Sequence, residues 1–421
     1  MNNTFYQRDT CRLCRGNNIK NVLMLASTAL CDAYLPYERR NEAQEVYPLG
    51  LFLCRDCGYV YLPYVVDPEI IYHDYIYVTN SSLGLSEHFK SYTDQVLQRI
   101  NPAEGSLVID IGSNDGTLLK FFKMKGMRVL GIEPASGIAR AATDSGVKTL
   151  VGFFNSKFAK RVKNEYGKAT IITANNLFAN IDDLEDFTEG VRELLAGDGV
   201  FIIESSYLAD MIENMVFDFI YHEHLSYLSV KPLIRFFDRF GMELIDIQRI
   251  PTKGGSLRYY IQLKTGSRPV SASVSEMVAY EERMGLGRPD IFKAFERKIN
   301  ECNAKLLSYI NKLQNQSKTI AGYGGSATST TLIYHFGLGQ ILDYIVDDNT
   351  AKQNTFSPGY HIPVLPSEVL YQRKPDYVVL LAWRYIEPII NKHRNFLEQG
   401  GRFIRPLPKF AIVGDGKGKD L

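Results

Sequence analysis

The sequence predicts an α/β protein whose central unit is a doubly wound parallel sheet, with a cysteine-rich module before it and a smaller α/β unit after it. Short apolar segments that end in acidic or amide residues alternate with helical segments through the middle of the chain. Two Cys-x-x-Cys pairs lie near the amino terminus, and a second glycine-rich turn follows residue 319. We expect domains over residues 1–75, 76–285 and 286–421.

The composition is that of a globular protein. Of the 421 residues, 45% are hydrophobic and 23% are charged, which is enough for two or three domains that each have a core. The formal net charge is only +1, so we expect neither nucleic acid nor a membrane surface as a partner. The sequence has no long apolar run and a polar amino terminus, from which we expect a cytoplasmic protein.

Four of the six cysteines form two short pairs, Cys11 with Cys14 and Cys54 with Cys57. A tight turn lets both thiolates of a pair bind one tetrahedral zinc ion, and four thiolates leave no open position for catalysis. The long spacer between the pairs must fold back as strands for this to happen. We therefore predict a structural zinc site, with two unrelated reduced thiol pairs as the alternative.

A strand and a glycine-rich turn open the predicted central unit. The apolar strand over 106–111 carries Asp110 near its end, and Gly112 and Gly116 flank a polar turn that contains Asn114 and leads into a helix. Glycine lets the backbone approach a ligand closely, and a helix amino terminus offers free N–H groups. The turn differs from the Gly-x-Gly-x-x-Gly pattern of dinucleotide-binding proteins. It is similar to the S-adenosylmethionine loop of class I (Rossmann-like) methyltransferases.

Two further strand ends support this interpretation. The next predicted strand, 127–132, is followed by Glu133, whose carboxylate can accept hydrogen bonds from both ribose hydroxyls. A third strand, 169–174, is followed by Asn175 and Asn176. The carboxyl ends of parallel strands meet at one edge of a sheet, so we predict that these side chains bind the cofactor.

The run Tyr221-His222-Glu223-His224 places acid–base groups downstream in the same domain. Histidines at i and i+2 share a face only in extended structure, which excludes a zinc-protease helix with its i, i+4 pair. Three uses stay open: a metal site, a buried pair of structural histidines, or an imidazole tuned by Glu223 that acts as a base near neutral pH.

A second α/β unit is predicted after a helical linker over 290–316. A strand and glycine turn over 319–326 lead into a helix over 327–336. Further strands are predicted at 343–346, 376–382 and 402–406. The glycines of this turn fit ligand binding or close strand–helix packing equally well.

The order of these modules and several longer motifs resemble the three-domain sugar C-methyltransferases. The resemblance runs over essentially the whole chain and rests on both cysteine pairs and on residues 110–116, 221–227, 254–258, 322–331 and 357–364. Members of that family use S-adenosylmethionine to methylate a carbon next to the ketone of a nucleotide-linked 4-keto-deoxysugar, commonly C-3. The resemblance therefore implies this methyl donor, a structural zinc ion and a sugar nucleotide as substrate, in a chain for which we favour a monomer.

The residues fit the implied chemistry. A C–H next to a carbonyl is acidic enough for an imidazole to remove its proton if donors hold the developing enolate oxygen. The resemblance implies that His224 is this base, with Glu223 and Tyr221 shaping its pKa and the substrate pose. It also implies an active-site tyrosine at Tyr75.

The resemblance places the sugar nucleotide near Gly255, Ser256, Arg258 and Tyr323, with Arg258 able to pair with a phosphate. One departure from the family pattern lies in this region. The run 328–330, Thr-Ser-Thr, replaces the usual Lys-Gly-Asn, which removes a positive charge that could face the nucleotide diphosphate.

A second departure concerns acid–base chemistry. Asn180 stands where family members commonly carry histidine. An amide can donate a hydrogen bond to an enolate but cannot shuttle a proton, so either His222 or His224 does all the acid–base work or the substrate differs. Two other functions stay open: an O- or N-methyltransferase on a related sugar nucleotide, and a non-catalytic zinc-ribbon binding protein that has kept a cofactor fold.

Overall fold

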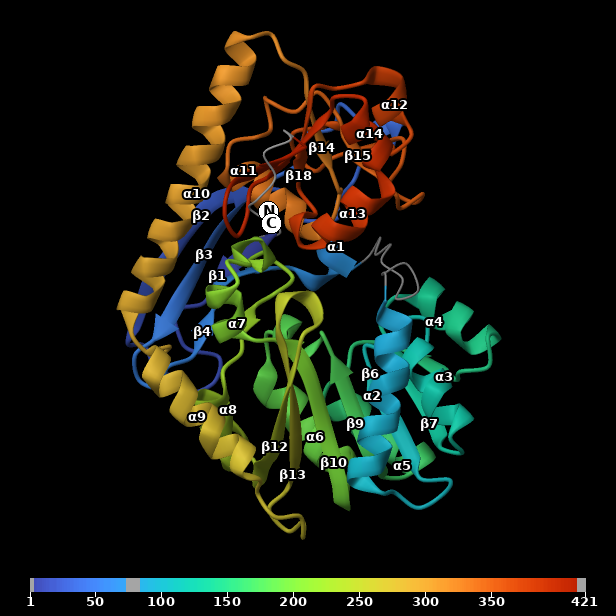
Figure 1. The fold of residues 1–421 in the computed structure, drawn as a ribbon. Coiled ribbons are helices and arrows are strands. Elements are labelled where there is room, and N and C mark those ends of the chain that lie inside the picture. The colour runs from blue at the N-terminus through green and yellow to red at the C-terminus, as the bar shows by residue number, and fades with distance from the viewer. Residues whose placement is uncertain (1–3, 73–83, 415–421) are drawn as a thin grey trace.

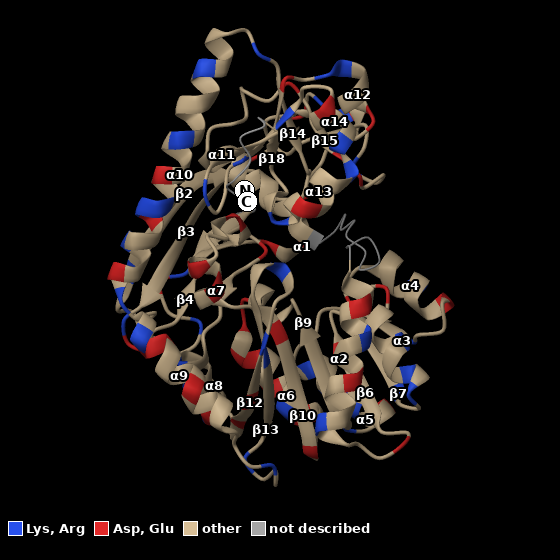
Figure 2. Cartoon of the chain, viewed as in Figure 1, with Lys and Arg blue, Asp and Glu red and all other residues tan. Residues whose placement is uncertain are grey.

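The structure, a computed structural model, describes residues 4–72 and 84–414. Three parts follow one another along the chain: a small amino-terminal sheet, a central sheet with helices on both faces, and a carboxyl-terminal α/β unit (Figure 1). Charged residues of both signs are spread over the outer helices, and they alternate along α9 and α10 (Figure 2). Among the described residues, no helix combines the length and the apolar character needed to cross a membrane.

The amino-terminal part is built on a four-stranded sheet in the order β11-β4-β3-β2. The long spacer between the cysteine pairs folds back as predicted, because it supplies β2 and β3. One strand, β11, comes from the central part of the chain and pairs with β4, so the two parts share a sheet. The bounds are β1 Phe5–Gln7, β2 Ile19–Thr28, η1 Tyr37–Arg39, β3 Tyr47–Cys54, β4 Val60–Tyr61, β5 Tyr64–Val66, α1 Pro68–Tyr72 and β11 Ser226–Tyr227.

The central sheet has seven strands in the order β12-β13-β10-β9-β6-β7-β8. All neighbours are parallel except β13, which is antiparallel to both β10 and β12. The chain runs from β6 outward to β8 and then returns to the other side of β6, which creates the switch point where ligands bind in such sheets. The bounds are β6 Leu107–Ile111, β7 Arg128–Glu133, β8 Thr149–Val151, β9 Ala169–Asn175, β10 Leu195–Ser206, β12 Met242–Ile250 and β13 Ser256–Leu263.

Helices cover both faces of this sheet, and therefore its strands are apolar throughout. Successive residues point to opposite faces: Val108 joins the core under α2 and α3, and Ile109 joins the larger core on the other face. The bounds are α2 Leu85–Ile100, α3 Thr117–Met124, α4 Ser136–Asp144, α5 Ser156–Tyr166, η3 Phe178–Asn180, α6 Leu184–Leu194, α7 Leu208–Glu213, η4 Phe217–Phe219, α8 Val230–Arg239, η5 Thr252–Gly254 and α9 Ala272–Met284.

The carboxyl-terminal part is a second seven-stranded sheet, in the order β16-β17-β15-β14-β18-β19-β20. The predicted linker is a single 27-residue helix, α10 (Pro289–Asn315), which contacts β2 on the side of the molecule (Figure 1). The remaining bounds are β14 Ile320–Tyr323, α11 Ala327–His335, β15 Ile345–Asp347, β16 Thr355–Phe356, β17 Pro363–Pro366, α12 Val369–Arg373, β18 Tyr377–Leu380, η6 Trp383–Tyr385, α13 Ile386–Lys392, α14 Arg394–Glu398, β19 Arg402–Arg405 and β20 Ala411–Val413.

Candidate active site

The four cysteines of the amino-terminal pairs converge on one point. Their sulfur atoms all lie within 4.8 Å of one another. The Sγ atoms of Cys11 and Cys57 are 3.7 Å apart, and those of Cys14 and Cys54 are 3.5 Å apart. Tetrahedral zinc with Zn–S bonds of about 2.3 Å needs sulfur atoms roughly 3.8 Å apart. The donor set therefore fits a structural zinc ion.

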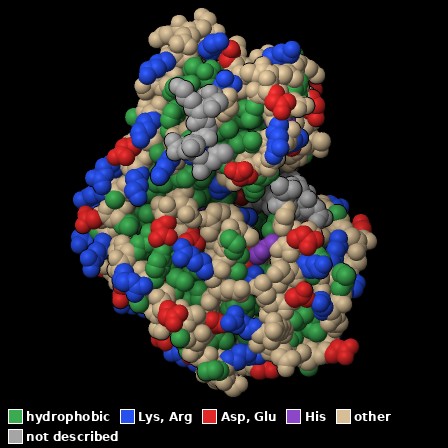
Figure 3. Space-filling model, viewed as in Figure 1, with side chains coloured by type: hydrophobic (Ala, Val, Ile, Leu, Met, Phe, Trp, Pro, Cys, Tyr) green, Lys and Arg blue, Asp and Glu red, His purple; other side chains and the backbone are tan. Residues whose placement is uncertain are grey.

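A cleft of about 1530 Å³ lies between the carboxyl edge of the central sheet and the carboxyl-terminal part. Figure 3 shows the surface hollowed between these two bodies. One wall contains residues 110–114, 132–134 and 175–177, which are the three strand ends that the sequence predicts. The opposite wall contains residues 323–328 and 347–352. Two sheet edges therefore face each other across one cavity.

Glu133 is held at the end of β7 by backbone groups. Its Oε2 accepts the N–H of Asn114 at 3.0 Å, and its Oε1 accepts the N–H of Ala135 at 3.0 Å. Burial raises the pKa of this carboxyl. The turn beside it needs its glycines, because Gly112 and Gly116 both have a φ of +74°. The carboxylate thus has a fixed position at the edge where a ribose would lie.

Two more polar groups on this wall fit a bound cofactor. Asp110 accepts a hydrogen bond of 2.6 Å from the hydroxyl of Thr173, and burial raises its pKa to about 7. The side-chain amide of Asn175 is buried in the cleft wall, and within the described parts of the chain neither its nitrogen nor its oxygen has a hydrogen-bond partner. Buried polar groups are almost always satisfied, so a ligand that pairs with this amide fits here. Asn176 lines the same wall.

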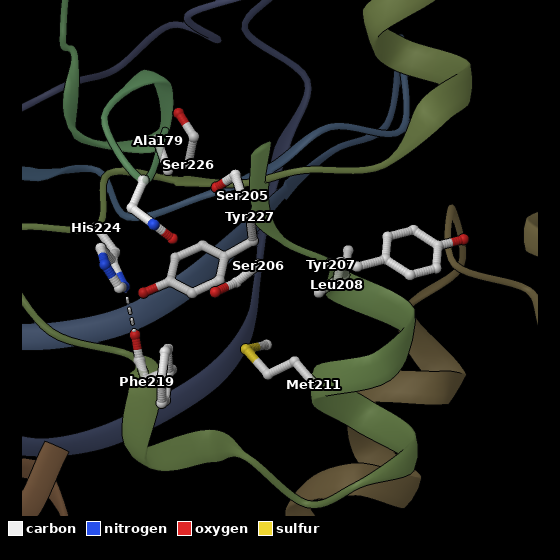
Figure 4. A pocket seen from close by; sticks show the side chains of 11 residues that line it. Ala179, Ser205, Ser206, Tyr207, Leu208, Met211, Phe219, His224, Ser226 and Tyr227 are labelled. Atoms are coloured by element: carbon white, nitrogen blue, oxygen red, sulfur yellow. Dashed lines mark hydrogen bonds between the residues drawn. The ribbon is translucent and has the colours of Figure 1, made fainter. Parts of the chain in front are cut away.

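His224 follows the 3-10 turn η4 and lines the cleft together with a small adjoining pocket (Figure 4). Its Nδ1 lies 3.0 Å from the carbonyl oxygen of Phe219. A carbonyl can only accept, so Nδ1 carries the hydrogen and Nε2 is the acceptor. Burial lowers the pKa of His224 to about 4, which keeps the ring neutral at physiological pH. The ring of Tyr221 packs against it with a centroid separation of 4.1 Å and a tilt of 33° between the ring planes.

Three of the other residues predicted to be catalytic line the cleft. Tyr221, Glu223 and Asn180 line the cleft beside His224. Burial, assisted by Asp32, raises the pKa of Glu223 to about 8. Tyr75 lies outside the described residues.

His222 does not line the cleft. Its Nε2 donates to the carbonyl oxygen of Pro48 at 3.1 Å, and its ring packs edge-on against Tyr47 with centroids 5.6 Å apart. Burial lowers its pKa to about 4. Of the three uses that the sequence leaves open for this residue, the structure places it as a buried packing histidine between two domains.

The segment predicted to face the sugar nucleotide is placed differently. Arg258 is only 1% exposed, and its Nε donates to Glu204 at 2.8 Å while its guanidinium stacks on Tyr92 at 4.0 Å. Arg258 therefore cannot make the phosphate contact expected of it, because its guanidinium is buried inside the central domain and does not line the cleft. Gly255 and Ser256 also lie outside the cleft lining.

Tyr323 does line the cleft, as the sequence predicts. Its hydroxyl donates to Asp348 at 2.8 Å. Beside it, Asp347 at the end of β15 accepts the N–H of Gly325 with one carboxylate oxygen and the N–H of Asn349, at 2.6 Å, with the other. Glu133 is held in the same way on the opposite wall, by one N–H of the preceding glycine turn and one N–H that follows its own strand. The two walls therefore repeat one arrangement.

Sequence reasoning missed the basic residues of the cleft, which are Lys253, Lys352, Arg384 and Lys392. Arg384 of η6 donates from its Nη2 to the hydroxyl of Thr328 at 3.2 Å. A cation from another element therefore lies beside the position where this chain lacks the lysine of the family pattern. Burial lowers the pKa of Lys253 to about 8. These residues come from separate elements of the chain, and no local pattern connects them.

Comparisons with known proteins agree with this architecture. Three family models match in succession: "Putative zinc binding domain" over residues 11–72, "Methyltransferase domain" over 86–247 and "C-methyltransferase C-terminal domain" over 251–408. The chain is 32% identical over 406 residues to C-methyltransferase NovU of Streptomyces niveus, which covers 96% of this chain and 97% of that protein.

Similarity to solved structures is lower. The PH0226 protein of Pyrococcus horikoshii OT3 has 12% identity and a TM-score of 0.36 over 46% of this chain and 97% of its own. Magnesium protoporphyrin IX methyltransferase of Synechocystis PCC 6803 has 12% identity and a TM-score of 0.34 over 43% and 84%. The similarity to NovU extends over nearly the whole chain, and the family models include the cofactor edge and the cysteine cluster. The chain therefore belongs to the C-methyltransferase family and is an S-adenosylmethionine-dependent methyltransferase with a structural zinc site.

Proposed function

We propose that this enzyme methylates a carbon next to the ketone of a nucleotide-linked 4-keto-deoxysugar, at C-3, through an enolate. The observation that carries the proposal is the position of His224. It presents a neutral ring with a fixed tautomer in a cleft that has a cofactor edge on one wall and basic residues on the other.

The first step that this geometry supports is proton removal. Nε2 of His224 is the ring atom left to accept a proton, because Nδ1 already donates to Phe219. The C–H electrons of the sugar then form the enolate double bond, and the ketone oxygen becomes the oxyanion. When bound, S-adenosylmethionine would supply the electrophilic methyl group for the new C–C bond, with its neutral thioether as the leaving group.

The oxyanion needs hydrogen-bond donors, and two of them line the cleft beside the base. Burial raises the pKa of Glu223 to about 8, so this carboxyl is protonated at neutral pH and can donate. The amide of Asn180 can donate without taking part in proton transfer. Asn180 is thus compatible with enolate chemistry even though family members commonly carry histidine at this position.

The opposite wall suits an anionic nucleotide. Lys352 and Arg384 line the cleft, where each also pairs with one carboxylate, Asp32 and Asp218. Ammonium and guanidinium groups have several N–H donors and are the usual partners of phosphate. Asp347 repeats on this wall the carboxylate arrangement that Glu133 forms on the cofactor wall. These features support a diphosphate-linked sugar whose nucleoside lies against the carboxyl-terminal part.

The proposal is tested by hydrogen exchange at the carbon next to the ketone. The zinc-loaded enzyme would be incubated in deuterated water with 4-keto-6-deoxyhexoses linked to dTDP, UDP, GDP or CDP, together with S-adenosylhomocysteine. We expect one of these compounds to take up deuterium at C-3, and to raise the unfolding temperature of the protein. An active enzyme that leaves the C-3 hydrogen in place during methyl transfer would instead indicate O- or N-methylation.

A pair of histidine variants assigns the exchange to its base. His224→Asn is expected to lose exchange and methyl transfer by at least a hundredfold while keeping its affinity for S-adenosylmethionine in calorimetry. His361→Asn is the matched control, because His361 lies outside the cleft lining and its φ of +53° is one that asparagine tolerates. Wild-type exchange in His224→Asn would remove His224 from the proposed role.

A further inference from the structure

The four residues before the Tyr-His-Glu-His run, Phe217 to Ile220, belong to the central domain, yet each contacts the carboxyl-terminal domain. The ring of Phe217 packs against His335 and Phe336 with centroids 5.4 and 5.2 Å away. The backbone carbonyl of Ile220 accepts a hydrogen bond of 2.8 Å from the hydroxyl of Thr331. The two ends of the turn are therefore held from α11.

The middle of the turn is held from η6. Asp218 is 0% exposed, and its carboxylate accepts the indole N–H of Trp383 at 3.0 Å and the Nη1 of Arg384 at 2.9 and 3.0 Å. The guanidinium of Arg384 also lies 4.5 Å from the ring centroid of Phe219. Among the described residues, the hydrogen-bond donors to this buried carboxylate all come from the carboxyl-terminal domain. Removing them leaves a buried charge unpaired, which is strongly unfavourable.

This turn carries the acceptor that orients the base. The carbonyl of Phe219 takes the Nδ1 hydrogen of His224, and it sits between Asp218 and Ile220. A shift of the turn would move that carbonyl, and misplacement of a catalytic group by about 1 Å can cost two orders of magnitude in rate. The contacts thus connect the docking of one domain to the orientation of a side chain in another.

We propose that the carboxyl-terminal domain positions the base, with Trp383, Arg384 and Thr331 holding residues 217–220 so that the Phe219 carbonyl fixes the tautomer and direction of the His224 ring. This inference rests on the proposed function, in which His224 removes the proton. Trp383 and Thr331 are positioning residues here, since they reach the ring only through the turn.

The test uses variants that each remove one contact from the zinc-loaded full chain. Trp383→Phe deletes the indole N–H, and Thr331→Val deletes the hydroxyl at nearly constant volume. Tyr377→Phe is the matched control, because it removes a hydroxyl contact with Tyr309 inside the same domain and away from the cleft lining.

The first readout needs no substrate. Long-range ¹H–¹⁵N correlation spectra of protein labelled with ¹⁵N-histidine distinguish the two neutral tautomers, and His224→Asn identifies the signal. We expect the Nδ1–H form in the wild type and in Tyr377→Phe, and a mixture of tautomers in Trp383→Phe and Thr331→Val. An unchanged His224 signal in both of these variants would overturn the proposal.

The second readout separates positioning from a general loss of structure. The kcat for methyl transfer should fall at least tenfold in Trp383→Phe, with the affinity for S-adenosylmethionine and the unfolding temperature close to those of Tyr377→Phe. Combined with His224→Asn, Trp383→Phe should lower the remaining rate no further, because both act through one ring. Additive losses would overturn the positioning role, whereas wild-type turnover in His224→Asn alone would overturn the proposed function.

Discussion

The guanidinium of Arg12 donates a hydrogen bond of 2.8 Å to the carboxylate of Asp182, and this contact joins the zinc-binding module to the central domain. Arg12 lies between Cys11 and Cys14 and is nearly fully buried. It also donates to the carbonyl oxygen of Leu62 at 2.8 Å. Asp182 lines the cleft. A zinc ion bound by the cysteine cluster would therefore hold the turn that carries Arg12, whose side chain contacts the cleft wall through Asp182.

Loss of the zinc ion should therefore lower the stability of the folded protein without acting directly on methyl transfer. We expect Cys14→Ser, or removal of zinc with a chelator, to lower the unfolding temperature by several degrees, because the turn from Cys11 to Cys14, which includes Arg12, loses its order. Calorimetry with S-adenosylmethionine should still detect binding. Cys302→Ser is the control, since this thiol lies far along the chain in α10 and outside the cysteine cluster. Equal stability of the two variants would contradict a structural role for the ion.

Glu133 should control affinity for the cofactor. Glu133→Gln keeps the shape of the side chain but replaces an oxygen acceptor with a donor, opposite backbone N–H groups that themselves donate. We expect the Kd for S-adenosylmethionine to rise at least tenfold, which corresponds to about 1.4 kcal/mol. The control Glu165→Gln changes an exposed carboxylate on α5, and it should bind as the wild type does. Calorimetry measures both.

Lys352 should affect the sugar nucleotide and leave the cofactor unaffected. Its Nζ donates to the carbonyl oxygen of Gly325 at 2.8 Å and pairs with Asp32, so its charge is fixed at the cleft wall. We expect Lys352→Gln to raise the KM for the sugar nucleotide about tenfold or more and to reduce its dependence on salt. The exposed Lys312 on α10 provides the control, Lys312→Gln. An unchanged KM would place the diphosphate elsewhere.

Acid should destabilise the protein over a defined range. Burial lowers the pKa of His222, His224 and His335 from 6.5 to about 4, so the unfolded chain binds protons at these positions first as the pH falls. Stability is then lost between pH 6.5 and 4, by up to about 1.4 kcal/mol per pH unit for each ring. Urea unfolding across this range measures the slope, and His222→Gln should make it shallower. The same slope in that variant would show that His222 titrates normally.

The sequence predicts the local elements of the site well and its long-range pairings poorly. The acidic and amide ends of β6, β7 and β9 follow from short apolar runs, and the parallel sheet brings them to one edge. Arg258 shows the limit. It lies opposite Glu204 in the antiparallel register of β10 and β13, and that pairing gives the guanidinium a buried partner. Nothing near Arg258 in the chain indicates this register.

The packing of the domains against one another sets a second limit on what the sequence can predict. His222 and His224 occupy similar sequence surroundings, yet His222 packs against Tyr47 of another domain and His224 faces the cleft. Lys253 and Arg384 reach the same cavity from segments far apart in the chain. Contacts of this kind join residues that are far apart in the chain, so local periodicity and spacing do not predict them.

The placement of β13 bears on how relatives of this enzyme can exchange parts. The family model for the carboxyl-terminal domain begins at residue 251, but β13 follows that point and pairs with β10 and β12 inside the central sheet. A chimera joined at residue 250 would insert one parent's strand, with Arg258, into the other parent's sheet. A junction after α9, at Met284, would keep each sheet from a single parent. Exchange of the carboxyl-terminal part between relatives is therefore constrained to a boundary that lies beyond the one marked by sequence similarity.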